Sequence, residues 1–232
     1  MKIPKIIVIF VCLCSTNVFA DLKLNPWSDK VFEQIETDYG AAASQRMKNI
    51  YQLILDNEDK PLRTKLEAAN TALNNLPWIS DREKWSADDY WATPFETLTQ
   101  FGGDCEDMAI GKLVVLRLMG IPKKNLYLTY AKVKKTGEIH MVLVWVNDAR
   151  TQILVLDNLD KTIKSGKMRT DLFVVYLTDA DGKMFLIQDD SKKRNIKAEF
   201  KPKRFEKLET VKQRMLENQA KYTKINGGKA LF

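Results

Sequence analysis

The sequence has few of the side chains that carry nucleophilic or acid–base chemistry. Its 232 residues include three cysteines and one histidine, His140. Two of the cysteines, Cys12 and Cys14, lie near the N-terminus, and Cys105 is the third. If the N-terminal segment is removed, one thiol remains and no disulfide can form within the chain. Chemistry that requires both a thiol and an imidazole must then use Cys105 and His140.

Long apolar runs are also absent. The run Ile6 to Leu13 is about half the length that a membrane span needs, follows two lysines and precedes small residues that end at Ala20. This order is typical of a signal peptide. We therefore expect residues 1–20 to be cleaved on export, which leaves a mature chain that begins at Asp21 and has no membrane span.

A lipid anchor at Cys14 is the alternative to simple export. Leu13 and Val11 stand where a lipid-attachment site would have small residues, so cleavage after Ala20 is favoured. The remaining 212 of the 232 residues, 21–232, fit one domain that is large enough to bury a substantial core.

The chain is mildly basic, but its basic residues do not indicate nucleic-acid binding. Lys plus Arg exceed Asp plus Glu by 37 to 30, and loss of Lys2 and Lys5 with the signal peptide lowers the net charge from +7 to +5. Basic residues gather at 192–204, with a single aromatic residue, Phe200, among them and without the Gly-rich loop of nucleic-acid-binding surfaces. We interpret this stretch as a solvated face, with an acidic partner or membrane headgroups as the alternative.

The spacing of apolar residues divides the chain into helices followed by strands. Apolar residues recur every three or four positions over 28–76, which predicts helices, and a Trp-rich irregular stretch follows over 76–90. Further helices are expected at 94–99, 105–119 and 205–222. Strand patterns occur at 126–133, 139–146, 153–156, 172–177 and 184–187. The expected fold class is α+β, with N-terminal helices, a central helix and an antiparallel sheet.

Three residues are candidates for a nucleophilic centre. Cys105 begins the predicted central helix, where free N–H groups and the helix dipole stabilise a thiolate. His140 lies in the second strand after that helix, and Asp157 ends the next strand. Adjacent strands can bring these two together, so that His140 takes the thiol proton while Asp157 fixes the tautomer of the imidazole.

A structural role is the alternative for each of these residues. A lone cysteine is often a small buried apolar residue, and a lone histidine is often a core or surface residue with one hydrogen bond. The run GGDCED from Gly102 to Asp107 argues against this alternative. Its glycines let the backbone approach a ligand closely, and its acids flank the thiol, so we favour a nucleophilic Cys105.

A resemblance to a known family rests on three segments. GGDCEDMAIGKLVVLRLMGIP, followed by EIHMVLVW and VLDNL, resembles the bacterial transglutaminase-like cysteine proteinases, most closely the periplasmic LapG proteases among them. The DCED context and the preceding WATPFETL are more specific than the Cys-His-Asp trio, and the likeness runs from about Trp78 to Leu159. It implies a papain-like or transglutaminase-like fold in which Cys105 is the nucleophile, His140 the base and Asp157 the orienting acid.

The resemblance also implies a calcium ion beside the nucleophile. The family's acidic ligands flank the catalytic cysteine, at positions that match Asp104 and Glu106, with Asp107 as a further candidate. Carboxylate oxygens suit calcium, although three side chains cannot fill its shell of about six to eight ligands. The alternative is that these acids merely stabilise the N-terminus of the Cys105 helix.

Two further features are assigned from the residues. The acidic run DADG at 179–182 lacks the later ligands of an EF-hand loop, so we interpret it as a hairpin turn. For the oxyanion hole we expect the main-chain N–H of Cys105 and, as a second donor, a group from the region of Trp85.

The function that the resemblance implies is that of a periplasmic, calcium-dependent cysteine endopeptidase. Its substrate would be the N-terminal region of a very large surface adhesin, cut near a pair of alanines so that a biofilm disperses. The periplasmic domain of an inner-membrane receptor for cyclic di-GMP would hold it inactive. A transglutaminase or acyltransferase with the same trio is the main alternative, since an amine can replace water in resolving the acyl-enzyme. A non-catalytic binding module is disfavoured by the intact trio.

Overall fold

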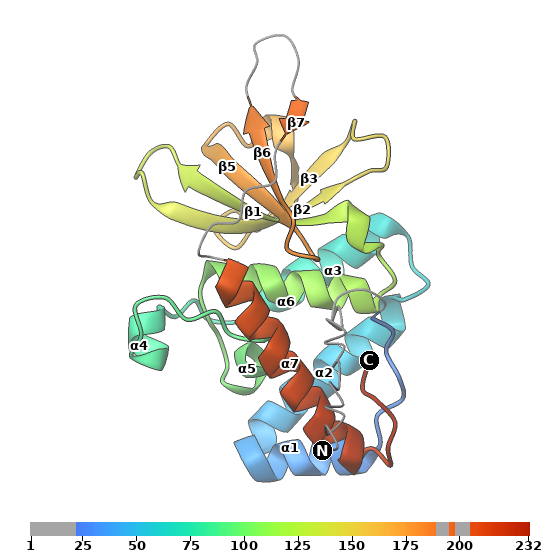
Figure 1. Ribbon diagram of the computed structural model, residues 1–232. Coiled ribbons are helices and arrows are strands. Elements are labelled where there is room, and N and C mark those ends of the chain that lie inside the picture. The colour runs from blue at the N-terminus through green and yellow to red at the C-terminus, as the bar shows by residue number, and fades with distance from the viewer. Residues whose placement is uncertain (1–21, 189–194, 198–204) are drawn as a thin grey trace, which may run out of the picture.

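The computed structural model describes residues 22–188, 195–197 and 205–232 (Figure 1). The predicted signal peptide at 1–20 and most of the basic stretch, at 192–194 and 201–204, lie outside these ranges. Within the described ranges, no helix combines the length and the apolar character that a membrane crossing requires.

Helices form the N-terminal half of the described chain and its C-terminal end. The helical lead-in predicted for 28–76 consists of three helices, and the helices expected near 94 and 105 begin at those positions. The prediction of an irregular stretch over 76–90 was wrong in part, because it contains a five-residue helix, Asp81–Trp85, that is too short to show a helical period. The helices are α1 (Asp29–Tyr39), α2 (Ala41–Asn57), α3 (Leu62–Asn74), α4 (Asp81–Trp85), α5 (Pro94–Thr99), α6 (Cys105–Leu118) and α7 (Phe205–Ile225).

Helix α6 is buried along almost its whole length. Every residue from Asp107 to Leu118 is buried, and a helix without a solvent-facing side must lie inside the molecule. At its start, the Asp104 main-chain N–H donates to Asp107 Oδ2 at 3.4 Å. Gly120, just beyond its end, has a φ of +83°, a left-handed conformation that glycine adopts without a steric penalty. These signals fix where the helix begins and ends.

The strands form one antiparallel sheet, and the predicted α+β fold class is confirmed. The described strands follow the order β4-β3-β2-β1-β5-β6-β7. They are β1 (Leu126–Val133), β2 (Ile139–Val146), β3 (Ile153–Leu156), β4 (Lys164–Ser165), β5 (Leu172–Asp179), β6 (Met184–Gln188) and β7 (Asn195–Lys197), with 3₁₀ turns η1 (Lys123–Asn125) and η2 (Gly166–Met168). Strands β4 and β7 were not predicted, because two or three residues are too short to show an alternating pattern.

The DADG run forms the expected hairpin turn. It joins β5 to β6, which pair antiparallel, and the Gly182 N–H donates to the Asp179 carbonyl at 3.0 Å. The prediction of a hairpin turn is therefore confirmed.

The core lies between the sheet and the helices. Leu116 of α6 belongs to the same buried cluster as Leu128, Leu143 and Leu156, which are successive cross-strand neighbours on β1, β2 and β3. In Figure 1 the sheet lies on one side of α6 and helices α2 and α7 lie on the other. This packing holds the N-terminus of α6 against strand β2, where the candidate site is found.

Truncation of Leu116 tests this packing. The side chain of Leu116 is fully buried, whereas Leu55 on α2 is 38% exposed. We expect Leu116→Ala to lower the free energy of unfolding by about 2–5 kcal/mol, since it removes buried methyl groups and leaves a cavity. Leu55→Ala, the matched control, should cost less than about 1 kcal/mol. Urea unfolding followed by circular dichroism measures both, and equal losses would contradict a central α6.

Candidate active site

The loop before α6 is held close to an upstream segment by backbone contacts. The Gly103 N–H donates to the Pro77 carbonyl at 3.3 Å, and the Ile79 N–H donates to the Gly103 carbonyl at 3.0 Å. Gly102 has a φ of +117°, and a Cβ added there would lie 2.5 Å from the Pro77 carbonyl oxygen. Gly102 is therefore needed for this close approach, whereas a Cβ at Gly103 would lie 2.3 Å from Asp107 Oδ2. Both glycines thus keep the loop before Cys105 tightly packed.

Cys105 lies where the N-terminus of α6 meets strand β2. Its sulfur accepts a hydrogen bond from the Met141 main-chain N–H at 3.4 Å. Its S–H donates to Glu106 Oε2 at 3.0 Å. The thiol is half-buried, so the residue is held by both the helix and the sheet.

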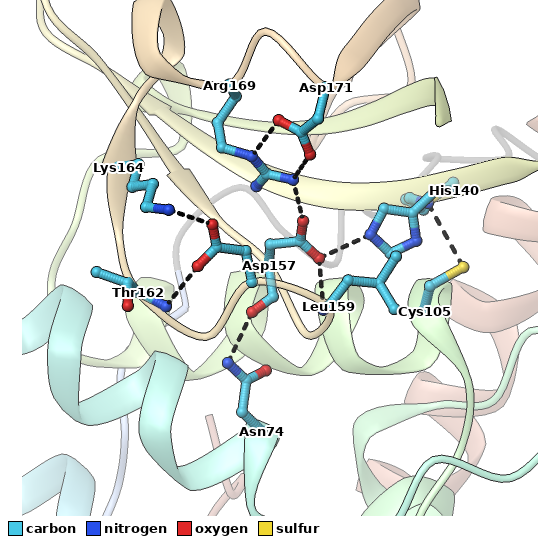
Figure 2. A network of polar contacts seen from close by, with 11 residues as sticks. Asn74, Cys105, His140, Asp157, Leu159, Thr162, Lys164, Arg169 and Asp171 are labelled. Atoms are coloured by element: carbon cyan, nitrogen blue, oxygen red, sulfur yellow. Dashed lines mark hydrogen bonds and ion pairs between the residues drawn. The ribbon is translucent and has the colours of Figure 1, made fainter. Parts of the chain in front are cut away.

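His140 and Asp157 form a buried pair on the sheet. His140 Nε2 lies 2.7 Å from Asp157 Oδ1, and His140 is only 4% exposed. Leu143 on β2 pairs with Leu156 on β3, so Asp157, the residue that follows β3, lies beside the strand that carries His140. Figure 2 shows the imidazole between the Asp157 carboxylate and Cys105, with its second nitrogen turned toward the sulfur. The structure thus brings the three predicted residues together.

Further contacts hold the Asp157 segment. The Leu159 main-chain N–H donates to Asp157 Oδ1 at 2.9 Å, and Asn74 Nδ2 of α3 donates to the Asp157 main-chain carbonyl at 2.7 Å. Burial raises the pKa of the Asp157 carboxyl, but hydrogen bonds and charges from His140, Leu159 and Arg169 outweigh this effect and lower the pKa to about 2. Asp157 is therefore an anion throughout the neutral range and can orient and support His140.

The electrostatic setting of the thiol differs from the expectation. The sequence predicted a thiolate stabilised by the helix N-terminus. Burial raises the pKa of the Cys105 thiol above its usual range, and the carboxylates of Glu106 and Asp104 raise it further. The hydrogen bond from the Met141 N–H lowers this pKa, but by less than the other effects raise it. Among the protein's own groups, the flanking acids oppose the helix dipole, because like charge beside a thiol disfavours the thiolate.

A cluster of acids lies beside Cys105. Carboxylate oxygens of Asp81, Asp104 and Asp107 lie within 4.8 Å of one another, and so do those of Asp81, Asp89 and Glu106. Asp104, Glu106 and Asp107 are the residues that the sequence singled out. Asp81 and Asp89 were not predicted from the sequence. Asp81 follows Ser80 at the start of α4, and an acid in that position is typical of an ordinary helix N-terminus.

The acids of this cluster are incompletely satisfied. Burial and the nearby charges of Glu106, Asp107 and Asp81 raise the pKa of Asp104 to about 9. Burial likewise raises the pKa of Asp107 to about 8 and, with the charge of Glu106, the pKa of Asp81 to about 6. The Oδ1 atoms of Asp81 and Asp104 are buried without a hydrogen-bond partner in the described chain. Hard oxygen donors crowded in this way suit a calcium ion.

Asp107 has a second, structural role. Its Oδ1 accepts the Ala92 N–H at 2.7 Å and its Oδ2 accepts the Asp104 N–H at 3.4 Å. Asp107 therefore joins the start of α6 to the segment before α5. This is the helix-stabilising role that the sequence analysis gave as the alternative for these acids. Because both of its oxygens already accept hydrogen bonds, Asp107 offers fewer free lone pairs to a metal than Asp104 does.

Trp85 lies close to the nucleophile loop. Lys84, its neighbour on α4, donates to the Gly102 main-chain carbonyl, and the Trp85 indole N–H is buried without a hydrogen-bond acceptor in the described chain. An unpaired buried donor beside the nucleophile loop has the chemistry of an oxyanion-hole group. That role for Trp85 stays a prediction.

Comparison with known protein families identifies the family of this chain. Residues 42–184, more than half of the chain, match the family described as bacterial transglutaminase-like cysteine proteinases, BTLCP. A comparison with the curated proteins found no match. The matched range contains Cys105, His140 and Asp157, as well as the acids of the cluster.

Solved structures of Legionella pneumophila LapG are similar over most of the chain. One is 29% identical with a TM-score of 0.68, and the alignment covers 83% of this chain and 99% of the LapG chain. An EGTA-treated form is 28% identical with a TM-score of 0.70 over the same shares. A calcium-bound form is 29% identical with a TM-score of 0.67, over 81% and 99%. The family resemblance predicted from the sequence is confirmed, and so is the transglutaminase-like fold.

The depressed pKa of Asp157 predicts a pH-dependent contribution to stability. A carboxyl whose pKa is lower in the folded than in the unfolded state stabilises the fold above the unfolded pKa of about 4, and this contribution is lost as the pH falls toward 2. We expect Asp157→Asn to lower the free energy of unfolding by on the order of 2 kcal/mol at pH 7.

The difference between wild type and Asp157→Asn should shrink as the pH falls from about 4 to 2. Urea unfolding at several pH values measures it, and Asp59→Asn, at an exposed position, is the control. A pH-independent difference would contradict the assignment of Asp157 as a buried anion.

Proposed function

Because this chain belongs to the bacterial transglutaminase-like cysteine proteinases, we propose that it is a cysteine endopeptidase that uses Cys105, His140 and Asp157. The observation that carries the proposal is the line of contacts from Asp157 Oδ1 to His140 Nε2, with the other ring nitrogen turned toward the thiol (Figure 2). This is the arrangement of nucleophile, base and orienting acid that acyl-transfer enzymes require.

The proposed reaction follows from this order. His140 takes the proton of Cys105 on the nitrogen that faces the sulfur, while its Nε2–H stays bonded to Asp157. The thiolate attacks the scissile carbonyl carbon, and the new oxyanion is bonded by the Cys105 main-chain N–H, which has no acceptor within the helix. The imidazolium returns its proton to the leaving amine. Water, deprotonated by His140, then hydrolyses the thioester and restores the thiol.

Calcium is the proposed cofactor, held by the acids beside the nucleophile. Asp104 and Glu106 are the proposed ligands from the sequence, with Asp107 in part, and Asp81 and Asp89 join them in the fold. The unpartnered carboxylate oxygens of Asp81 and Asp104 support this set. When bound, the ion would supply positive charge that offsets the acids around Cys105 and favours the thiolate. A calcium-bound form of the similar Legionella pneumophila LapG is consistent with this proposal.

The proposed substrate is the N-terminal region of a large surface adhesin, cleaved in the periplasm so that biofilm cells are released. The proposed regulator is the periplasmic domain of an inner-membrane receptor for cyclic di-GMP. Similarity to LapG supports both, and the predicted signal peptide at 1–20 supports export to the periplasm.

Cleavage of a candidate substrate tests the proposed activity. The mature chain, incubated with an N-terminal adhesin fragment that contains adjacent alanines, should generate one new N-terminus. Cys105→Ala and His140→Ala should each lower the rate by at least about a thousandfold, since loss of a triad member removes most of the catalysis. Mass spectrometry of the products measures both. An amide adduct formed with an added primary amine, in place of new termini, would identify an acyltransferase instead.

Calcium binding tests the proposed ligand set. Titration calorimetry on the purified protein should detect binding, and Asp81→Asn and Asp104→Asn should each weaken it at least about tenfold, because each removes a charged oxygen ligand. Asp88→Asn is the matched control, since Asp88 lies in the same segment but is exposed and bonded to Arg82. If wild type and Asp81→Asn bind calcium with equal affinity, Asp81 is not a ligand of the ion.

A further inference from the structure

Arg169 is a buried cation that contacts the acid of the proposed triad. It follows η2, and its side chain is only 4% exposed. Its Nη2 lies 2.7 Å from Asp157 Oδ2 and 2.8 Å from Asp171 Oδ2, and its Nε donates to Asp171 Oδ1 at 2.9 Å. Figure 2 shows the guanidinium between these two carboxylates, on the side of Asp157 that faces away from His140.

The two oxygens of Asp157 have separate partners. Oδ1 faces His140 Nε2 and the Leu159 N–H, whereas Oδ2 faces the guanidinium. A carboxylate held at both oxygens cannot rotate about its Cβ–Cγ bond without losing an ion pair or a hydrogen bond. Because Asp171 fixes the guanidinium through two parallel hydrogen bonds, the arginine is itself rigid.

Arg169 also supplies the charge that a buried Asp157 needs. The side chain of Asp157 is 0% exposed, and an isolated carboxylate would not stay ionised in such a place. His140 carries a positive charge only when it is protonated. The other charged groups that act near this carboxylate are Lys112 of α6, whose pKa burial lowers to about 7, and Asp171, whose like charge opposes ionisation. Arg169 is the one whose positive charge does not depend on pH in the neutral range.

We infer that Arg169 is a positioning residue of the proposed triad, which holds Asp157 as an anion with Oδ1 directed at His140 Nε2. The inference rests on the proposed triad and adds a fourth residue to it. Arg169 does not touch the reacting atoms. It acts through Asp157, which keeps the imidazole proton on Nε2 and so leaves the other ring nitrogen free to accept the thiol proton.

The tautomer of His140 is a direct measure of this role. His140 is the only histidine, so ¹⁵N signals of the imidazole in a chain without a purification tag are unambiguous. The wild type should hold its proton on Nε2 near neutral pH. In Arg169→Met the Nε2–H form should lose its dominance, because Asp157 can rotate or become protonated, and Arg169→Lys should restore it in part by returning the charge.

The reactivity of Cys105 gives a second measure that needs no substrate. Alkylation by iodoacetamide, at fixed calcium, should be at least about tenfold slower in Arg169→Met at pH 7. Its fall at low pH should begin at a higher pH than in the wild type, because Asp157 is protonated sooner without the arginine. Lys164→Met is the matched control. Lys164 pairs with Asp160 in the loop after Asp157 (Figure 2), but contacts no member of the triad.

Asp171→Asn covers the case in which Arg169→Met does not fold, as judged by circular dichroism. Its side chain is 54% exposed, so the fold should tolerate the change, and alkylation should slow about two- to fivefold because the arginine is less firmly held. If folded variants at 169 or 171 keep the wild-type tautomer and alkylation rate, the inference is overturned. A slower rate with an unchanged tautomer and pH profile would show a purely structural arginine, which also overturns it.

The failure of the proposed function has a different signature. If wild-type Cys105 reacts no faster than Cys105 in His140→Ala, the triad itself is absent, and the inference falls with it. If no adhesin fragment is cleaved while alkylation and tautomer respond to Arg169 as expected, the substrate assignment fails and the positioning role stands.

Discussion

The packing of helix α6 against the sheet controls the geometry of the whole candidate site. Cys105 is the first residue of this helix and His140 lies on β2, 35 positions later in the chain. No local interaction could bring the two together. They meet because apolar residues of α6 share one buried cluster with those of β1, β2 and β3, and close packing in such a core leaves little freedom for the helix to slide. The contact between the Met141 N–H and the Cys105 sulfur is the direct result.

The site combines two groups of acids with opposite electrostatic character. Asp157 lies opposite His140 and Arg169, and its pKa is lowered to about 2. Asp104 lies among other carboxylates, and its pKa is raised to about 9. The same side chain type therefore serves as a fixed anion on the sheet and as a candidate metal ligand at the helix. Partners, rather than residue identity, decide which role each carboxylate has.

Much of the fold and the central trio could be predicted from residue pattern and number. The period of the apolar residues located the long helices and the long strands, and a single histidine with one thiol outside the N-terminal segment left no choice of pair. Asp81, Asp89 and Arg169 could not be found in this way. They lie at a helix start and in irregular segments, where no periodicity marks a buried side chain, and their partners are distant in sequence. Asp81 and Asp104, for example, are 23 positions apart, and Arg169 approaches Asp157 only because the chain turns back after β3.

The sequence by itself determined which side chains are available: one imidazole, one thiol beyond the predicted signal peptide, and a run of acids around that thiol. It also determined the elements on which they lie, because helix and strand periodicity depend on neighbours a few positions away. Only the tertiary structure decided how these side chains act on one another. Burial and the approach of residues from separate elements set whether a carboxylate is an anion held by Arg169 or a crowded acid beside Cys105, since electrostatic interactions depend on distance in space and on exclusion of water.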